Sequence, residues 1–119
     1  MRRSKFLQQL SREHHVALKL AKACENAAAH DVSEMCKKAL QVFAEKLEPH
    51  FQHEERGLPA LLDSELSIRL FEEHRLLRES ALSLQQREAM MLQAFGRLLA
   101  AHVRFEEREL FEFIERHLK

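Results

Sequence analysis

Two segments of the chain repeat one chemical pattern: a His, a Glu four residues later, then a second Glu and an Arg. The pattern occupies residues 50–56 and 102–108. On an α-helix, residues four apart lie almost above one another, about 6 Å apart along the axis, so the imidazole and the first carboxylate can reach one shared point. This spacing is typical of a metal site, and the chain carries it twice, as His50 with Glu54 and His102 with Glu106.

Two single His residues extend the predicted set of donors. His14 and His74 each follow an acidic residue, Glu13 and Glu73, on the apolar face of a predicted helix. His15 is adjacent to His14 and could replace it after a modest rotation of the helix, so the sequence leaves two candidates at this position. The predicted metal-binding set is His14, His50, Glu54, His74, His102 and Glu106.

The composition favours long helices, because the 119 residues include only two Gly and two Pro. Apolar residues at three-and-four spacing predict one helix over about residues 5–29 and another over about residues 32–57. Asp63 or Ser64 can cap a third helix, and a fourth follows it. Short connections between such helices predict an all-α fold, an up-down-up-down antiparallel four-helix bundle, as a single domain over residues 1–119.

The start of the fourth helix decides whether the His residues of the second half face one another. Ser83 and Gln86 form a capping-box pattern, which predicts a turn centred near Gln86. With that turn, His74 and His102 differ in height by roughly 6 Å along the bundle, at about 1.5 Å per residue. A turn nearer Glu88 would remove the offset.

Imidazoles and carboxylates without a thiolate suit iron, manganese or zinc, and several His with two Glu that can bridge suit a pair of iron ions. In the simplest division, each ion takes two His residues and both Glu residues are shared. The first ion has His14 and His50, the second has His74 and His102, and the shared residues are Glu54 and Glu106. We therefore predict two iron ions with a bridging oxo or hydroxo group, and positions left for water or a diatomic ligand such as O2 or NO.

The same residues resemble a known family. A single His on the first and third helices, with His-x-x-x-Glu on the second and fourth, is the pattern of the hemerythrin-like family, the HHE cation-binding domains, which this chain resembles over essentially its whole length. The resemblance implies reversible O2 binding, sensing of O2 or NO, or iron handling. The oxygen carriers of the family place a second His four residues after the first on the third helix, where this chain has Arg78. This departure favours reactivity over O2 storage, because the nearby iron would have one more open position.

The charge balance narrows the expected partners. Nineteen basic residues balance nineteen acidic ones, so the chain lacks the basic surplus with which proteins bind nucleic acid or an anionic membrane. No apolar run is long enough for a signal peptide or a membrane span. We expect a cytoplasmic protein whose partner is a small diatomic ligand or peroxide.

Two further pairs of residues call for an interpretation. Glu55 and Glu107, the second Glu of each repeated segment, point about 100° further round their helices, so we expect surface salt bridges, with hydrogen bonds to the metal-binding His residues as the alternative. Cys24 and Cys36 are interpreted as buried apolar residues, with a redox-sensing disulfide as the alternative.

The leading functional hypothesis is a non-haem di-iron protein that binds or senses O2 or a related small oxidant, NO or peroxide. The alternatives are a di-iron enzyme that consumes peroxide or NO, a protein for iron storage or delivery, and a bundle that only dimerises. Metal binding separates the first three from the last, because a site built from ligands on four helices couples metal binding to folding.

Overall fold

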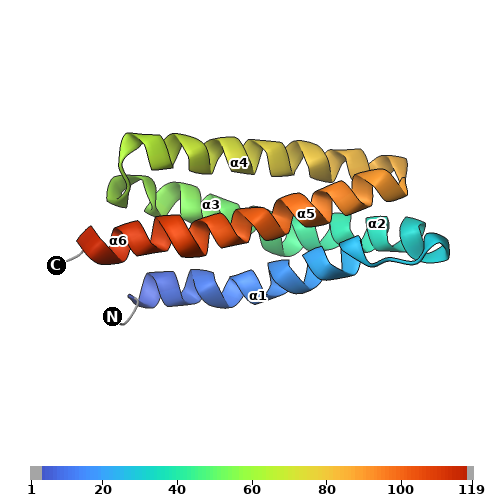
Figure 1. The fold of residues 1–119 in the computed structure, drawn as a ribbon, viewed down its shortest axis with the longest axis horizontal. Helices are drawn as coiled ribbons and strands as arrows, with labels where there is room; N and C mark the ends of the chain where they lie inside the picture. Colours follow the sequence, from blue (N-terminus) through green and yellow to red (C-terminus); the bar gives the residue numbers. More distant parts are fainter. Residues whose placement is uncertain (1–3, 118–119) are drawn as a thin grey trace.

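Four helical rods pack side by side as an all-α four-helix bundle (Figure 1). The computed structural model describes residues 4–117. The first rod is α1 (Lys5–Glu25) and the third is α4 (Ser64–Ser83). The second rod consists of α2 (Val32–Val42) and α3 (Glu48–Gly57), joined by the π-helical turn η2 (Phe43–Leu47). The fourth rod consists of α5 (Ala89–Phe105) and α6 (Phe111–His117), joined by the π-helical turn η5 (Glu106–Leu110). The 3₁₀ turns η1 (Ala29–Asp31), η3 (Pro59–Leu61) and η4 (Leu84–Gln86) lie in the connections. In Figure 1 each rod returns along the one before it, and α1 begins at the end of the bundle where α6 ends.

Side chains cap the first and third rods at their starts. The Leu7 amide donates to the Ser4 hydroxyl at 3.3 Å, and the Leu66 amide donates to a carboxylate oxygen of Asp63 at 2.8 Å. Such bonds satisfy amides that have no partner within the helix. The third helix therefore begins where the sequence predicts, with Asp63 as the capping residue.

The fourth rod begins later than the capping-box pattern predicts. Ser83 is the last residue of α4, and its hydroxyl donates to the Ser80 carbonyl instead of capping a new helix. The chain continues through η4 so that Leu84 stays fully buried, and it reverses at Arg87, whose φ is 57°. The prediction of a helix start at Ser83 is wrong, and the turn lies near Glu88, the position that brings the two His residues of the second half to one level.

The π-helical turn η5 changes which residues of the fourth rod face the core. A π-helical turn inside an α-helix shifts the buried face by about one position. Glu106, Leu110, Phe111 and Ile114 are consequently all fully buried, although Leu110 and Phe111 are adjacent in the sequence. The turn thus begins at Glu106 and brings the Phe111 ring to a stacked position beside His14, with ring centroids 5.6 Å apart.

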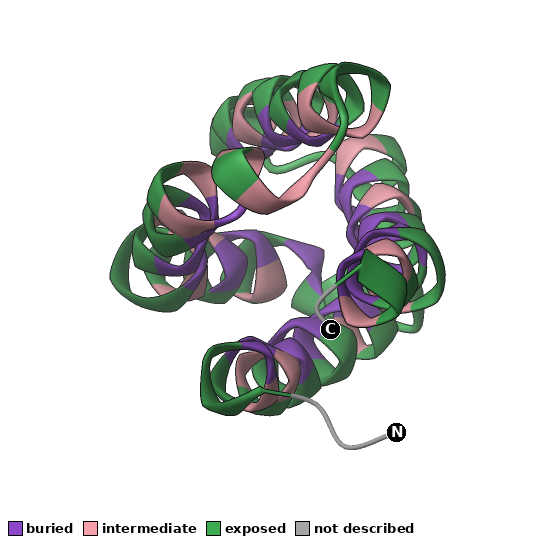
Figure 2. Cartoon of the chain, turned by 90° about the vertical axis from the view of Figure 1, so that its left-hand side faces the viewer, coloured by how far each residue is buried: buried purple, intermediate pink, exposed green. Residues whose placement is uncertain are grey.

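Apolar side chains form two clusters along the bundle. One includes Leu77, Phe95 and Leu99, and the other includes Leu7, Leu70 and Phe111. The view along the bundle shows the buried residues on the faces of the rods that turn toward the centre (Figure 2). Among the described residues, the buried polar or charged side chains are His14, His50, Glu54, His74, His102 and Glu106.

The first and fourth rods approach each other closely at Gly96. A Cβ atom at this position would lie 2.7 Å from the carbonyl oxygen of Ala21 and 3.1 Å from the Cβ of Cys24. Glycine therefore allows α5 to pack directly on the backbone of α1.

Cys24 and Cys36 are free and buried, which confirms their interpretation as buried apolar residues.

Within residues 4–117, no helix combines the length and the apolar character that crossing a membrane requires.

Candidate metal centre

The structure brings all six predicted metal-binding residues together at the centre of the bundle. They come from every rod: His14 from α1, His50 and Glu54 from α3, His74 from α4, His102 from α5 and Glu106 from η5. His14 is 3% exposed, whereas its neighbour His15 is exposed on the surface. His14 is therefore the residue of the pair that faces the interior.

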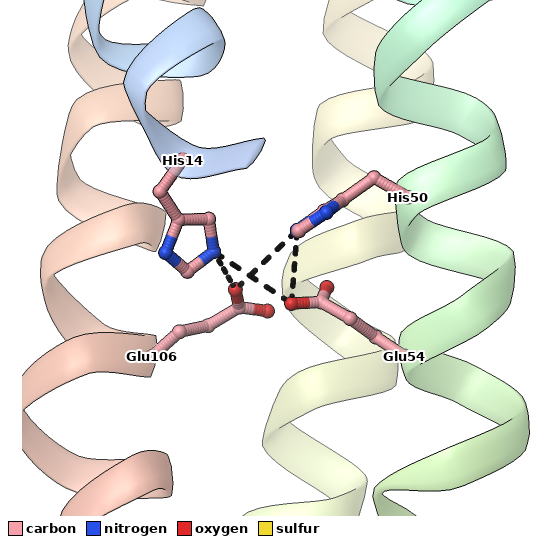
Figure 3. Close-up of side chains that lie close together, drawn as sticks. All are labelled: His14, His50, Glu54 and Glu106. Atoms are coloured by element: carbon pink, nitrogen blue, oxygen red, sulfur yellow. Dashed lines mark hydrogen bonds and ion pairs between the residues drawn. The ribbon is translucent and has the colours of Figure 1, made fainter. Parts of the chain in front are cut away.

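The six side chains form two groups of potential ligands. Site 1 consists of His14, His50, Glu54 and Glu106, and site 2 consists of Glu54, His74, His102 and Glu106; within each site, the ligand atoms lie within 4.8 Å of one another. Figure 3 shows site 1, with the carboxylate oxygens of Glu54 and Glu106 between the two imidazoles. This grouping is the one that the sequence predicts, with both Glu residues shared.

Each shared carboxylate directs one oxygen at each site. Glu54 places one oxygen 3.0 Å from His50 Nε2 in site 1 and the other 3.0 Å from His74 Nε2 in site 2. Glu106 places one oxygen 2.7 Å from His14 Nε2 and the other 2.9 Å from His102 Nε2. This is the arrangement that a carboxylate adopts when it bridges two cations.

Four buried atoms in the two sites lack a hydrogen bond: His50 Nε2, Glu54 Oε2, His102 Nε2 and Glu106 Oε2. The nitrogen and oxygen of each i, i+4 pair are 3.0 Å and 2.9 Å apart, but their geometry is not that of a hydrogen bond. Leaving buried polar atoms without partners costs about 1–3 kcal/mol each, and more for charged groups. A cation in each site would coordinate these lone pairs, so the residues fit a pair of metal ions.

A carboxylate also holds the other nitrogen of every imidazole. The pairs are His14 with Glu107 (2.6 Å), His50 with Glu13 (2.6 Å), His74 with Glu55 (2.8 Å) and His102 with Glu73 (2.7 Å). Because an ionised carboxylate only accepts hydrogen bonds, Nδ1 carries a proton in each pair, so Nε2 is the nitrogen that can bind a metal once its own proton is lost. The outer carboxylates thus fix both the orientation and the protonated nitrogen of each imidazole.

The model of the family "Hemerythrin HHE cation binding domain" matches residues 5–114. The chain belongs to the hemerythrin HHE family. No curated protein and no solved structure matches the chain. The buried His and Glu groups of this HHE domain are the residues suited to the cation binding for which the family is named.

The expectation of salt bridges holds for Glu55, which pairs with Arg78, but both Glu55 and Glu107 also form the hydrogen bonds to metal-site His residues that were the alternative. Both are partly buried and bind metal-site His residues of another rod, His74 and His14 respectively. In a four-helix bundle, a residue that lies 100° from the core-facing direction points toward the adjacent rod, not toward solvent. Glu13 and Glu73 act in the same way on His50 and His102.

The surrounding carboxylates change the pKa values of the imidazoles in the metal-free HHE domain. Burial lowers the pKa of His14, but hydrogen bonds to Glu106 and Glu107 and the nearby carboxylate of Glu54 outweigh it and raise this pKa to about 11. Burial also lowers the pKa values of His50 and His102, but the nearby carboxylates, Glu106 and Glu54 among them, raise both to about 10. Burial raises the pKa of Glu106, but His102, Glu54 and His14 hold it well below its usual value. The imidazoles therefore bind protons tightly in the absence of metal, and a cation must displace the protons on Nε2.

Arg78, four residues after His74 on α4, pairs with carboxylates of α3. Its guanidinium group binds the carboxylates of Glu48 and Glu55 at 2.8 Å. The ring of Phe51 stacks on His74, with centroids 4.1 Å apart and planes 12° from parallel. His74 is consequently fully buried, with an aromatic ring on one face and a carboxylate at Nδ1.

Proposed function

We propose that this HHE domain is a non-haem di-iron protein that binds or senses O2 or a related small oxidant such as NO or peroxide. The observation that supports it is the pair of four-residue sites that share Glu54 and Glu106, with one oxygen of each carboxylate directed at each site. Imidazole and carboxylate ligands without thiolate suit iron. Four protein ligands for each ion leave coordination positions that a small molecule can take.

Iron would supply the electrons and the coordination positions with which O2, NO or peroxide reacts. The residues of the chain would hold and orient the ions. The shared carboxylates would hold both ions, and the outer carboxylates orient the imidazoles so that each Nε2 is directed inward. The apolar clusters on either side limit the access of water.

Small ligands would reach site 1 from the surface. A pocket of about 340 Å³ is lined by Glu13, Leu47, Pro49 and His50, among others, so an imidazole of site 1 forms part of its wall. A smaller pocket of about 170 Å³ is lined by residues that include His14. In site 2, by contrast, His74 is fully buried beneath Phe51. We therefore propose that the ion of site 1 meets the incoming ligand.

An absorption spectrum of iron-loaded protein tests the proposal. We expect the protein to bind about two iron ions per chain, and its reduced form to develop the absorption bands of a bridged ferric pair when O2 is added. Replacement of a shared ligand, Glu106→Ala, should remove these bands. Replacement of His15, the exposed residue next to His14, by alanine (His15→Ala) should leave them unchanged. An iron-loaded protein whose spectrum does not change with O2, NO or peroxide would reject the proposal.

The same preparation separates the alternatives. Steady consumption of peroxide or NO would indicate an enzyme, and the rate should then fall sharply in His102→Ala. Rapid loss of iron to a chelator would indicate storage or delivery. Iron that resists the chelator for days and responds reversibly to O2 would favour binding or sensing.

A further inference from the structure

Arg78 is hydrogen-bonded to Glu55, and Glu55 is hydrogen-bonded to His74, a residue of site 2. We propose that Arg78 is a positioning residue for the metal in site 2: it holds Glu55 where Glu55 orients the imidazole of His74. The proposal rests on the metal binding of the proposed function, and on no particular reaction of the metal. Because Glu55 is hydrogen-bonded to both Arg78 and His74, the effect of Arg78 on site 2 passes through Glu55.

The guanidinium group of Arg78 joins two carboxylates of α3. Its Nε and Nη2 atoms each donate to a different oxygen of Glu48, both at 2.8 Å. Its Nη1 and Nη2 atoms donate to the two oxygens of Glu55, at 2.8 Å and 3.2 Å. A planar group with two forks of donors can hold two carboxylates in one fixed arrangement, which a lysine ammonium group cannot do.

Glu55 carries the effect from Arg78 to the imidazole. The oxygen that accepts from Arg78 Nη1 also accepts the proton of His74 Nδ1, at 2.8 Å. Glu48 and Glu55 are both negatively charged and lie on the same side of α3, so without the guanidinium group they would repel each other. Glu55 would then be free to turn toward solvent, and the ring of His74 would lose the partner that keeps Nε2 directed at site 2.

The arrangement serves one site only. The two halves of the chain align through Glu13-His14 and Glu73-His74, so the position equivalent to Arg78 in the first half is Leu18. Leu18 is 39% exposed and has no charge with which to hold a carboxylate. A change at Arg78 should therefore act on one of the two bound ions, the one in site 2.

The ion pairs of Arg78 contribute little to the stability of the fold. The side chains of Arg78 and Glu48 are 33% and 28% exposed, and ion pairs in contact with water stabilise proteins weakly. The variant Arg78→Met keeps the length of the side chain and removes the charge, so it should fold. Arg75→Met is the matched control, because Arg75 lies on the same helix and pairs with Glu72 and Glu79 on the surface.

Zinc titration of the protein tests the proposal, since Zn²⁺ accepts His and carboxylate ligands and is diamagnetic. A His50→Ala background removes a ligand of site 1, so that the affinity of site 2 is measured alone against a competing chelator. In this background we expect Arg78→Met to weaken zinc binding about 10–100-fold, the usual effect of losing an outer partner of a metal-binding His. Arg78→Lys should lie between Arg78→Met and the parent protein, and Arg75→Met should match the parent.

Nuclear magnetic resonance of the zinc-loaded protein gives a second measurement, made at the imidazole of His74 itself. The Nδ1 proton of His74 should exchange slowly with water in the parent protein and in Arg75→Met, and faster in Arg78→Met. Equal zinc affinity and equal exchange in Arg78→Met and the parent would overturn the proposal. If the wild-type protein binds two zinc ions but its iron-loaded form does not respond to O2, NO or peroxide, the proposed function fails while the effect of Arg78 still stands.

Discussion

His14 Nδ1 lies 2.6 Å from a carboxylate oxygen of Glu107, although the two residues are 93 positions apart in the chain. The equivalent contact in the other direction joins His74 of the second half to Glu55 of the first, at 2.8 Å. Each half of the chain thus orients one imidazole of the other half. The two metal sites consequently depend on how the halves are docked.

The shared carboxylates should be worth more to metal binding than any single imidazole. Glu54 belongs to both sites, whereas His14 belongs to site 1 alone. We expect Glu54→Ala to lower the bound metal from about two ions per chain to nearly none, and His14→Ala to lower it to about one. Metal analysis of the desalted proteins measures this, with His15→Ala as the control. Two ions retained in Glu54→Ala would contradict the bridging role.

Metal removal should lower the melting temperature. A ligand that binds only the folded state stabilises it by about 2.7 kcal/mol at a concentration one hundred times its Kd. For a chain of this size, that corresponds to a change on the order of 10 °C. Thermal unfolding with added metal, and again after chelation, measures the effect. If the melting temperature does not change, the bundle is a structural module that does not need the ions.

The stability of the metal-free protein should fall at alkaline pH. The pKa values of His14, His50 and His102 are raised from 6.5 to about 11, about 10 and about 10. A raised pKa in the folded state contributes stability that is complete below the unfolded value and is lost as the pH rises through the folded value. We therefore expect the free energy of unfolding to decline from about pH 7 toward pH 11. Denaturant unfolding across this range measures it, and an increase in stability over the same range would contradict the assignment.

The pKa of Glu106 gives the opposite dependence at low pH. It is held well below its usual value of 4.5, so its contribution is present above that value and is lost as the pH falls. Protons also compete with metal for the imidazoles, so metal affinity should rise with pH. Titration of metal at several pH values, with measurement of the protons released, checks the second statement.

Gly96 should be less tolerant of alanine than Gly57. A Cβ at Gly96 would lie 2.7 Å from the Ala21 carbonyl oxygen, and backbone would have to move. Overpacking costs about 1–3 kcal/mol, which exceeds the gain of about 1 kcal/mol from replacing glycine inside a helix. A Cβ at Gly57 would meet only the end of the Phe6 ring, which is 38% exposed and can rotate away. We expect Gly96→Ala to lower the midpoint of urea unfolding and Gly57→Ala to leave it nearly unchanged.

The inner part of the centre could be predicted from the sequence because its signal is local. The i, i+4 spacing of His50 with Glu54 and of His102 with Glu106 is a property of one helix, and the apolar stripe shows which way each helix faces. The same stripe favours His14 over His15, and the structure agrees. The contacts of Glu13, Glu55, Glu73 and Glu107 instead join different parts of the chain, and their geometry follows from how the rods pack. The sequence indicates these contacts only through the repetition of Glu-His and Glu-Glu in its two halves.

Two other features depended on packing that local patterns do not record. Ser83 and Gln86 match a capping box, but the burial of Leu84 keeps the chain helical for another turn before it reverses at Arg87. The π-helical turn at Glu106 has no simple sequence pattern, yet it brings Phe111 beside His14. In both places, packing in the core outweighs the conformation that the local sequence pattern favours.

Each half of the chain contributes one carboxylate to the site of the other half, and this has a consequence for assembly. Site 1 is incomplete without Glu106, and site 2 is incomplete without Glu54, so neither hairpin made as a separate fragment would contain a finished centre. Two fragments divided within η3 would have to associate before either ion found its full set of ligands. The ions would then fasten the two fragments to each other, and reconstitution of the bundle from its pieces would depend on the supply of metal.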